Sequence, residues 1–260
     1  MKLFILLPSY NEEKDLPNLL ESFKNLFEKI DIEYEVVVIN DGSDDGTEYA
    51  AKQWIDKLNI KIINHNMNLG LGVAVNTGLT FFQKSCKDDD IAIIMDADNT
   101  HNPQLIISML KSIKNGSEVV IASRYEKGGS EIGLTFFRHF CSLCINLLLS
   151  IIFGVPGVQD YTCGYRAYSA ETISRGYKLY GNNFIEEKGF TCMAEIIIKL
   201  HFAGCKISEI PLVLRYDQKS GKSKMKIVST IKRYFILIKN LRHYRQQLII
   251  KPLVMNGKEK

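Results

Sequence analysis

Short apolar runs alternate with segments of helical periodicity through the first half of the chain. The apolar runs cover residues 3–7, 34–39, 60–63, 91–95 and 119–122. Such runs are typical of strands that are buried on both faces. Between the first two, apolar residues recur at helical spacing: Leu16, Leu19, Leu20, Phe23, Leu26, Phe27 and Ile30. The pattern predicts three further helices: one ends at Trp54, one ends at Phe82, and one begins at Pro103. This alternation predicts an α/β fold with a doubly wound, mostly parallel sheet.

The second half is less regular. Residues 140–159 carry no charge, and their apolar core, 143–153, is shorter than the roughly 20 residues that a membrane span needs. We therefore expect a buried or interfacial helix there. Residues 207–214 are expected to form an edge strand interrupted by Pro211. The pattern predicts one domain over 1–222 and a basic amphipathic helix and tail over 223–260. The apolar positions expected on that helix are Met225, Ile227, Val228, Ile231, Phe235 and Ile238, and the basic ones are Lys226, Lys232, Arg233 and Lys239.

Polar clusters follow the ends of the predicted strands. They lie at 9–12 (SYNE), 40–43 (NDGS), 96–98 (DAD) and 123–125 (SRY). In open α/β sheets, ligands bind beyond the carboxyl ends of the strands. The coincidence of four polar clusters with four strand ends therefore predicts a single ligand site.

Composition and charge add an asymmetry along the chain. The 260 residues carry a net charge of +4, with 46% hydrophobic and 24% charged residues, as in ordinary globular proteins. From Arg215 to the end there are 13 Lys or Arg and 2 Asp or Glu, a balance of +11, so residues 1–214 sum to −7. The basic end is either a solvated helix or a surface for an anionic partner. The start of the chain does not resemble a signal peptide, and the six cysteines, including Cys141 and Cys144, are expected to be reduced core thiols of a cytosolic protein.

Asp96 and Asp98 are the strongest candidates for chemistry. Two carboxylates one residue apart at a strand end can both reach Mg²⁺ or Mn²⁺, which prefer oxygen ligands and are often shared with substrate phosphates. The alternative is a turn with two solvated aspartates. Asp41 is either a nucleotide contact or part of a turn. Likewise, the glycines of 68–74 form either a phosphate cradle or a simple turn.

Taken together, these segments resemble the family 2 glycosyltransferases of GT-A fold, in particular dolichyl-phosphate mannose synthases and related polyprenyl-phosphate sugar transferases. The matching segments, in the family's order, are LPSYNEE (7–13), VINDGSDDGT (38–47), NLGLGVAVNTGL (68–79), MDADNTHNP (95–103), ASRY (122–125), DYTCGYRAY (160–168) and SGKSKM (220–225). The resemblance implies a doubly wound mixed sheet flanked by helices. It also implies metal-dependent, inverting transfer of a hexose, mannose or glucose, from a GDP- or UDP-sugar to a polyprenyl phosphate.

The resemblance also implies roles for single residues. The nucleotide sugar would be held by Pro8, Tyr10, Glu12, Ile39, Asp41, Asp96, Ala97 and Asp98, and the metal by Asp96 and Asp98. Arg124 and Arg138 would face the acceptor phosphate, Lys224 would help to close the site, and Ser142 and Asn146 match polar family positions. From their residue types alone, Arg124 could equally be a salt-bridged surface residue, and Arg138 could extend from an apolar helix towards water.

The chain departs from the family at three positions. Asn40 replaces an Asp, and Thr100 stands where a third metal ligand, Gln, is common. Gln218 replaces an Arg, for which Arg215 or Lys219 would substitute. The resemblance further implies a protein peripheral to the cytoplasmic face of a membrane, anchored by its own amphipathic segments or by a partner protein, with no role for nucleic acid.

Two alternatives stay open at this point. A transferase of the same fold that acts on a saccharide hydroxyl would need a base such as Glu195, although that residue lies in a helix where a solvated glutamate is the default. A non-catalytic nucleotide- or membrane-binding module is the other alternative. His65, His101 and His139 show no metal-ligand spacing and are expected to be structural.

Overall fold

The computed structural model describes the backbone of residues 1–221 and 227–255 and the side chains as far as Tyr244. Its centre is a seven-stranded mixed sheet in the order β3-β2-β1-β4-β7-β5-β8. The neighbours along β3-β2-β1-β4 are parallel, and so are β5 and β8. The strands are β1 (Lys2–Ser9), β2 (Glu33–Asn40), β3 (Ile60–Asn64), β4 (Ile91–Ile94), β5 (Val119–Ser123), β7 (Arg166–Ser169) and β8 (Ile207–Pro211).

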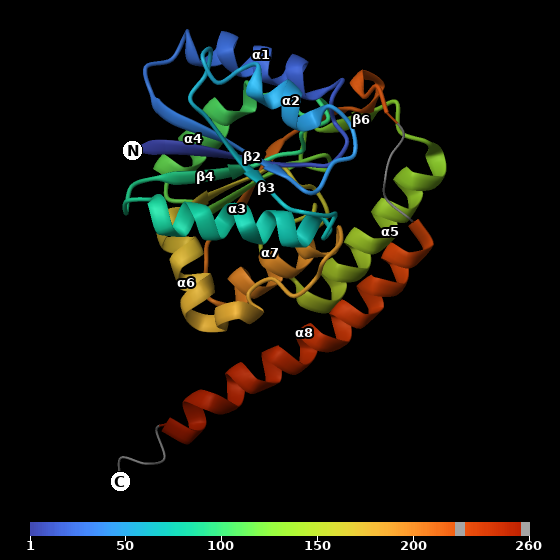
Figure 1. Ribbon diagram of the computed structural model, residues 1–260. Helices are drawn as coiled ribbons and strands as arrows, with labels where there is room; N and C mark the ends of the chain where they lie inside the picture. The colour runs from blue at the N-terminus through green and yellow to red at the C-terminus, as the bar shows by residue number, and fades with distance from the viewer. Residues whose placement is uncertain (222–226, 256–260) are drawn as a thin grey trace.

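Helices cover both faces of this sheet (Figure 1). On one side lie α1 (Leu16–Phe27), α2 (Thr47–Lys52) and α4 (Leu105–Lys114). On the other side α3 (Leu71–Ser85), α6 (Ala170–Tyr180) and α7 (Cys192–Phe202) pack against one another. The α/β architecture expected from the alternating pattern is confirmed.

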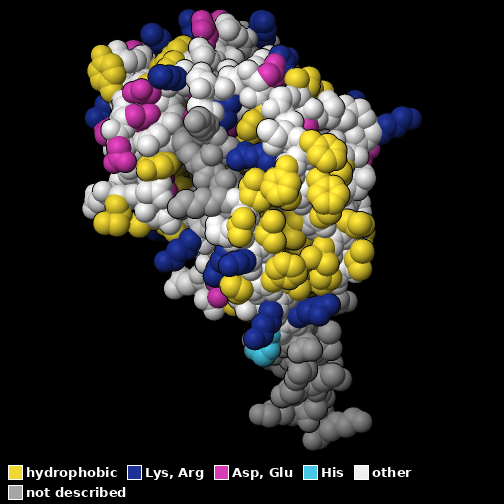
Figure 2. Space-filling view, turned by 90° about the vertical axis from the view of Figure 1, so that its right-hand side faces the viewer, with side chains coloured by type: hydrophobic (Ala, Val, Ile, Leu, Met, Phe, Trp, Pro, Cys, Tyr) yellow, Lys and Arg dark blue, Asp and Glu magenta, His cyan; other side chains and the backbone are white. Residues whose placement is uncertain are grey.

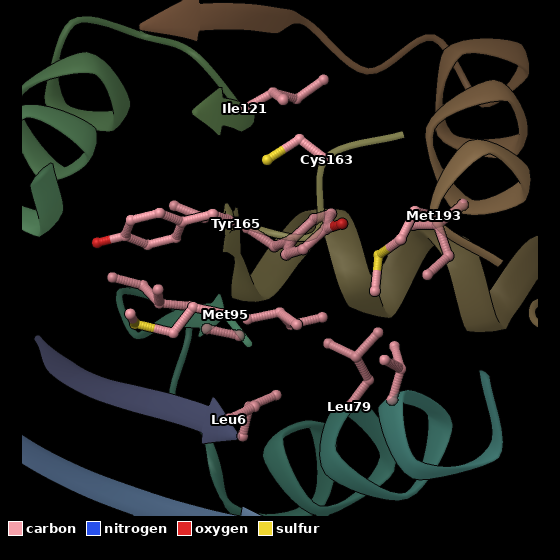
Figure 3. Close-up of a cluster of buried hydrophobic side chains, with 14 of the residues drawn as sticks. Leu6, Leu79, Met95, Ile121, Cys163, Tyr165 and Met193 are labelled. Atoms are coloured by element: carbon pink, nitrogen blue, oxygen red, sulfur yellow. The ribbon is translucent and has the colours of Figure 1, made fainter. Parts of the chain in front are cut away.

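The core explains why these segments form these elements. Residues 3–7 and 36–39 of the central strands are buried, as continuous apolar runs require. In α1 the six buried residues are Leu16, Leu19, Leu20, Phe23, Leu26 and Phe27, the stripe that the periodicity predicted. Figure 3 shows where strands and helices meet: Leu6, Met95 and Ile121 come from or next to the sheet, and Leu79 and Met193 from α3 and α7.

Strand β7 was not expected from the hydrophobic pattern. It runs antiparallel between β4 and β5, with Ile93 opposite Ala167 and Val120 opposite Ala167 on the two sides. Since β7 is reversed, its beginning lies at the edge where the parallel strands end. The segment that precedes it, 160–165, is thereby carried to the polar clusters.

The remaining elements form one side of the molecule. After Pro211 ends β8, the edge strand, the chain continues as β9 (Val213–Arg215), which pairs with β6 (Ser130–Ile132), so the predicted interruption is confirmed. Helix α5 (Phe136–Phe153) contacts α8 (Ile227–Met255), which also packs on α7. Short 3-10 turns occupy Gly181–Asn183 and Tyr216–Gln218.

Helix α5 has few buried residues. Only Asn146, Leu149 and Phe153 are buried, and among the described helices it is the one whose length and composition would allow it to cross a membrane. All six cysteines are free thiols, but Cys144 is exposed and Cys86 and Cys141 are half-buried, so the expectation of core thiols was wrong for these three. The interior of the molecule does not explain the apolar character of α5.

The apolar stripe predicted for the C-terminal helix is divided between two environments. Ile238 is buried together with Tyr234, Leu237 and Leu241, whereas Val228 and Phe235 are exposed. Met225 and Lys226 lie outside the described residues. The helix thus packs on the rest of the protein through part of its apolar surface.

Candidate functional site

A cavity of about 690 Å³ lies at the carboxyl ends of the parallel strands. Of the residues named from the sequence, those that line it include Pro8, Tyr10, Glu12, Asp41, Asp96, Ala97, Asp98, Thr100, Arg124, Arg138, Ser142 and Lys219. Ile39 does not line it: its side chain is buried, with its Cδ1 3.1 Å from the point where a Cβ on Gly78 would lie. Lys224 lies outside the described residues. The cavity continues between α5 and α8, which contribute Cys141, Ile145, Ile231 and Tyr234.

Two interlocked loops form one end of the cavity. Glu12 N donates to Thr47 Oγ1 over 2.7 Å, Asp44 N to Asn11 Oδ1 over 2.9 Å, and Gly46 N to Glu13 Oε2 over 2.9 Å. Asn11 adopts φ 54°, a left-handed conformation that Asn tolerates better than most residues. The loops after β1 and β2 therefore hold each other in place around Tyr10.

The carboxylate of Asp41 is anchored by three donors. His65 Nδ1 lies 2.6 Å from Asp41 Oδ1, to which Leu69 N also donates, and Gly70 N donates to Oδ2 over 2.8 Å. His65 follows the end of β3, so its place at this edge of the sheet could have been predicted from the same strand-end rule. Asp41 thus organises the glycine-rich turn, while it still lines the cavity.

The glycine-rich turn packs against another loop. Gly72 N donates to Lys188 O over 2.8 Å, and a Cβ on Gly72 would lie 1.8 Å from Glu187 O. Gly70 has φ 97°, and a Cβ on it would lie 2.4 Å from Lys188 O. A side chain at Gly72 would collide with the backbone, so the turn needs glycine for packing.

Asp96 and Asp98 lie at the centre of the cavity. Burial raises the pKa of Asp96. Burial also acts to raise the pKa of Asp98, but Lys219, His101 and the hydrogen bonds from Lys219 and Thr100 together outweigh it and hold that pKa below its usual value. Lys219 Nζ is 2.5 Å from Asp98 Oδ2. Thr100, in the position of the missing glutamine, donates its hydroxyl to Asp98 Oδ1 over 2.7 Å. Asp98 is therefore a carboxylate at neutral pH, held between a cation and a hydroxyl.

Of the two proposed substitutes for the missing arginine, it is Lys219 that reaches the cavity. Arg215 pairs with Asp217 over 2.7 Å at the surface. In the part of the chain that the structure describes, no three His, Cys, Asp or Glu side chains gather into a metal site. Asp96 and Asp98 by themselves supply carboxylate oxygens, and any metal held there would take its other ligands from elsewhere.

The Arg124 side chain is only 9% exposed, and its charge is compensated. Its guanidinium donates to both oxygens of Asp160 over 2.7 Å and to Glu131 Oε1 over 2.8 Å. Burial lowers the pKa of Arg124, but Asp160 outweighs this effect and raises it well above the usual value. Neither carboxylate was identified in the sequence, because they lie 36 and 7 residues away and only the fold pairs them. Arg124 lines the cavity as a fixed, neutralised group.

Arg138 contrasts with Arg124. It lies half-buried in the first turn of α5 and lines the cavity, and it makes no hydrogen bond or ion pair with any residue of the described part. The polar positions further along α5 are structural. Tyr125 donates to Ser142 Oγ over 2.8 Å, and Asn146 Oδ1 accepts from Tyr161 N over 2.7 Å. Arg138 is thus a cation that no described residue compensates, at the end of the cavity formed by the helices.

Glu195 is not a solvated helix residue, so that expectation was wrong. It is 1% exposed, lies 2.7 Å from Lys199 Nζ, and accepts from Glu186 N and Glu187 N. Burial raises its pKa. Glu195 does not line the cavity. Its role is to order the loop that supports the glycine-rich turn, because α7 turns this side chain inward.

Comparisons with known proteins agree with this geometry. The chain is 31% identical to a dolichol-phosphate mannosyltransferase of Pyrococcus furiosus over 87% of this chain, although it spans only 60% of that protein's length. It is 28% identical to a dolichyl-phosphate beta-glucosyltransferase of Trichomonas vaginalis (91% of this chain, 72% of that protein). It is also 28% identical to an undecaprenyl-phosphate mannosyltransferase of Micrococcus luteus (86% and 88%).

Solved structures share the fold. A glucosyl-3-phosphoglycerate synthase from Mycobacterium tuberculosis, crystallised with Mn²⁺ and UDP-glucose, aligns with a TM-score of 0.63 at 16% identity, over 94% of this chain and 78% of that one. The S. aureus protein TarS aligns with a TM-score of 0.56 at 19% identity, over 82% and 60%. The expected GT-A fold is confirmed. A model of glycosyl transferase family 2 matches residues 4–175, more than half of the chain, and the protein therefore belongs to glycosyl transferase family 2.

Proposed function

We propose that this protein transfers a hexose from a nucleotide sugar to a polyprenyl phosphate at the surface of a membrane. The supporting observation is the continuity of the cavity. It runs from the interlocked loops past Asp96 and Asp98 to Arg138 between two helices. All three relatives reported above are named as mannosyl- or glucosyltransferases of dolichol, dolichyl or undecaprenyl phosphate.

The two ends of the cavity suit the two substrates. We place the nucleotide at the loops around Pro8, Tyr10 and Asp41, and its diphosphate next to Asp96 and Asp98. An uncompensated guanidinium such as Arg138 favours an anion, since it can donate two parallel hydrogen bonds to a phosphate. The acceptor phosphate is therefore placed at α5.

Helix α5 supports a lipid acceptor through its second face. The cavity face carries Arg138, Cys141, Ser142 and Ile145, at helical spacing. The outward face carries an apolar stripe, which we call the α5 stripe: Phe136, Phe140, Leu143, Leu147 and Ile151, all exposed. Figure 2 shows hydrophobic side chains gathered on this side of the molecule. Exposed apolar patches mark membrane or protein interaction sites, and a membrane here would bring a lipid phosphate close to Arg138.

The chemistry needs no strong base. A phosphate oxygen of the acceptor attacks the anomeric carbon, the bond from that carbon to the diphosphate breaks, and the bonding electrons leave with the nucleoside diphosphate, which inverts the configuration. Mg²⁺ or Mn²⁺ held by Asp96 and Asp98 would neutralise the charge that develops on the diphosphate. The oxygen-only donor pair and the cation that already sits on Asp98 fit such a metal. The acceptor is already an anion, which agrees with the absence of Glu195 from the residues that line the cavity.

A transfer screen tests the proposal. The purified chain is incubated with GDP-mannose, UDP-glucose and other nucleotide sugars, with and without Mn²⁺, against polyprenyl phosphate in vesicles or free saccharides. We expect metal-dependent product on the lipid phosphate. Product on saccharides alone would contradict the lipid assignment, and binding of nucleotide without any transfer would favour a non-catalytic module. We further propose that the protein is peripheral to the cytoplasmic face, anchored by its own helices or by a partner.

A further inference from the structure

An ammonium group occupies the centre of the cavity. Lys219 Nζ lies 2.5 Å from Asp98 Oδ2 and 3.9 Å from Glu12 Oε1, and the Lys219 side chain is only 8% exposed. Burying a lysine is costly unless carboxylates compensate its charge. The position of this side chain is therefore set by the acidic residues of the cavity.

The backbone on both sides of Lys219 is tethered to the site. Ser220 N donates to both carboxylate oxygens of the buried Asp15, over 3.2 and 3.1 Å. Arg215 N donates to Thr100 O over 3.1 Å, and Thr100 lies two residues after Asp98 in the chain. Lys219 thus contacts Asp98 from a segment whose backbone is itself hydrogen-bonded to the site, unlike a lysine on a mobile surface segment.

A metal at Asp98 and Lys219 would compete for the same oxygen. Mg²⁺ binds oxygen ligands at roughly 2.0–2.1 Å, which leaves no room for an ammonium hydrogen bond to the same atom. The two positive charges would also repel each other. A nucleotide diphosphate changes this balance, because it brings enough negative charge for two cations.

We propose that Lys219 is a resident counter-cation that holds the metal position until a nucleotide diphosphate arrives, so that metal and nucleotide bind together and free metal binds weakly. This proposal rests on the metal-dependent function proposed above. On binding, Lys219 Nζ leaves Asp98 and pairs with the diphosphate. Lys219 thereby sets the order of binding and keeps the buried carboxylates compensated between turnovers.

Titration with Mn²⁺, followed by the electron paramagnetic resonance signal of the free ion, tests this without any transfer reaction. The full chain is titrated alone and with UDP or GDP, after correction for the metal that the nucleotide binds in protein-free solution. For the wild type we expect nucleotide to tighten Mn²⁺ binding at least tenfold. Lys219→Met should bind Mn²⁺ at least tenfold more tightly than wild type without nucleotide. Lys219→Arg, which keeps the charge, and Lys206→Met, which removes an exposed lysine elsewhere, should behave like wild type.

The outcomes distinguish the counter-cation role of Lys219 from the metal-dependent function on which it rests. If Lys219→Met binds Mn²⁺ alone no more tightly than wild type, while nucleotide still promotes binding, the counter-cation role is overturned and the metal site stands. If none of the proteins binds Mn²⁺ with nucleotide, both fail. Hydrogen exchange of wild-type peptides over 214–221 needs no variant. Mn²⁺ with UDP should change their exchange, and unchanged protection would overturn the displacement of Lys219.

Discussion

Charged side chains around the cavity differ in how far their charge is compensated. Arg124 is held between Asp160 and Glu131, whereas Arg138 has no counter-ion among the described residues. A compensated cation gains little from an added phosphate, while an uncompensated one gains a charge-assisted hydrogen bond. We therefore assign Arg124 to the positioning of the 160–162 segment and keep Arg138 for the acceptor.

Asp98→Asn should reduce transfer roughly a thousandfold or more, because several kcal/mol of charge stabilisation at the diphosphate would be lost. The amide keeps the size of the side chain, so folding is checked by the melting temperature. Initial rates with saturating Mn²⁺ measure the effect, with EDTA treatment of the wild type in parallel. Turnover close to wild type under both conditions would show that the metal hypothesis is wrong.

Arg138→Ala should raise the acceptor KM or lower kcat while donor binding stays close to wild type. The reason is its place at the helical end of the cavity, next to the α5 stripe and away from Tyr10 and Asp41. Acceptor kinetics and calorimetric binding of the nucleotide distinguish the two substrates. Tenfold weaker donor binding, or unchanged use of lipid phosphate, would contradict the assignment.

The Arg124–Asp160 pair gives a prediction for stability. Arg124→Met should lower the free energy of unfolding by about 3–5 kcal/mol near pH 7, since it leaves Asp160 buried without its counter-ion. Denaturant unfolding measures this change. Arg215→Met, which breaks an exposed pair, is the matched control and should leave the melting temperature nearly unchanged. An equally small effect for both variants would count against the role of the buried pair.

The same pair predicts a pH dependence. Burial would raise the pKa of Asp160, but Arg124 outweighs it and the pKa is lowered. A lowered native pKa stabilises the fold above the unfolded value, about 3.9, and this contribution is lost as the pH falls from there through the native pKa. In Arg124→Met the burial that raises the pKa is no longer opposed by Arg124, so the variant's Asp160 takes up its proton at a higher pH and its penalty is relieved earlier. The stability difference between wild type and Arg124→Met should therefore narrow as the pH is lowered from 7 to 3. A constant difference would contradict the linkage.

At the scale of elements, a chain of contacts joins the loop after β2, at one end of the cavity, to helix α8 at the other. Asp41 holds the glycine-rich turn, and this turn packs on the loop that contains Glu187. Glu187 in turn pairs with Arg233 on α8 over 2.7 Å. A shift of the turn would therefore reach both ends of the cavity.

Gly72→Ala should test this connection. Its Cβ would collide with Glu187 O, so the turn and the loop must separate, and we expect both a lower melting temperature and at least tenfold weaker nucleotide binding. Gly78→Ala, in the same helix, is the control. Its Cβ would meet the flexible end of Ile39 at 3.1 Å, and alanine raises helix propensity by about 1 kcal/mol. Wild-type nucleotide affinity in Gly72→Ala would disprove the coupling.

At the scale of the molecule, one side differs from the rest. Besides the α5 stripe and Phe137, helix α8 exposes Val228, Phe235 and Ile236. Figure 2 shows basic side chains at the border of the apolar surface. Phe136 is 83% exposed. Apolar side chains bordered by basic ones are typical of proteins that lie on anionic membranes.

Replacing Phe136 and Phe140 by serine should abolish or strongly weaken sedimentation with anionic vesicles, because the variant loses apolar area that would enter the bilayer. Transfer to vesicle-borne lipid should fall while nucleotide binding is unchanged. A double variant at Tyr49 and Ile55, exposed apolar residues at and just after α2, serves as the control. Equal vesicle binding by all three proteins would show that the stripe does not contact the membrane.

Local pattern determined much of the fold. Strand and helix periodicity depends on neighbouring residues, so the parallel strands, α1 and the clustering of Asp41, Asp96 and Asp98 at one edge could all be predicted. The edge strand ending at Pro211 has the same origin, because proline removes a backbone donor locally. The role of these residues in binding a nucleotide sugar stays a prediction.

Only the tertiary structure decided the rest. The reversed direction of β7, the pairing of Arg124 with Asp160 and the approach of Lys219 to Asp98, 121 residues away, depend on contacts between distant segments. Such contacts leave no periodic signal in the sequence. The same holds for Glu195, which the helical pattern placed in solvent, since only packing shows which face of a largely apolar helix is covered. For α5 the pattern was consistent with a buried or an interfacial helix, and only the fold shows that no more than Asn146, Leu149 and Phe153 of it are buried, because the packing of distant segments decides which apolar residues are covered.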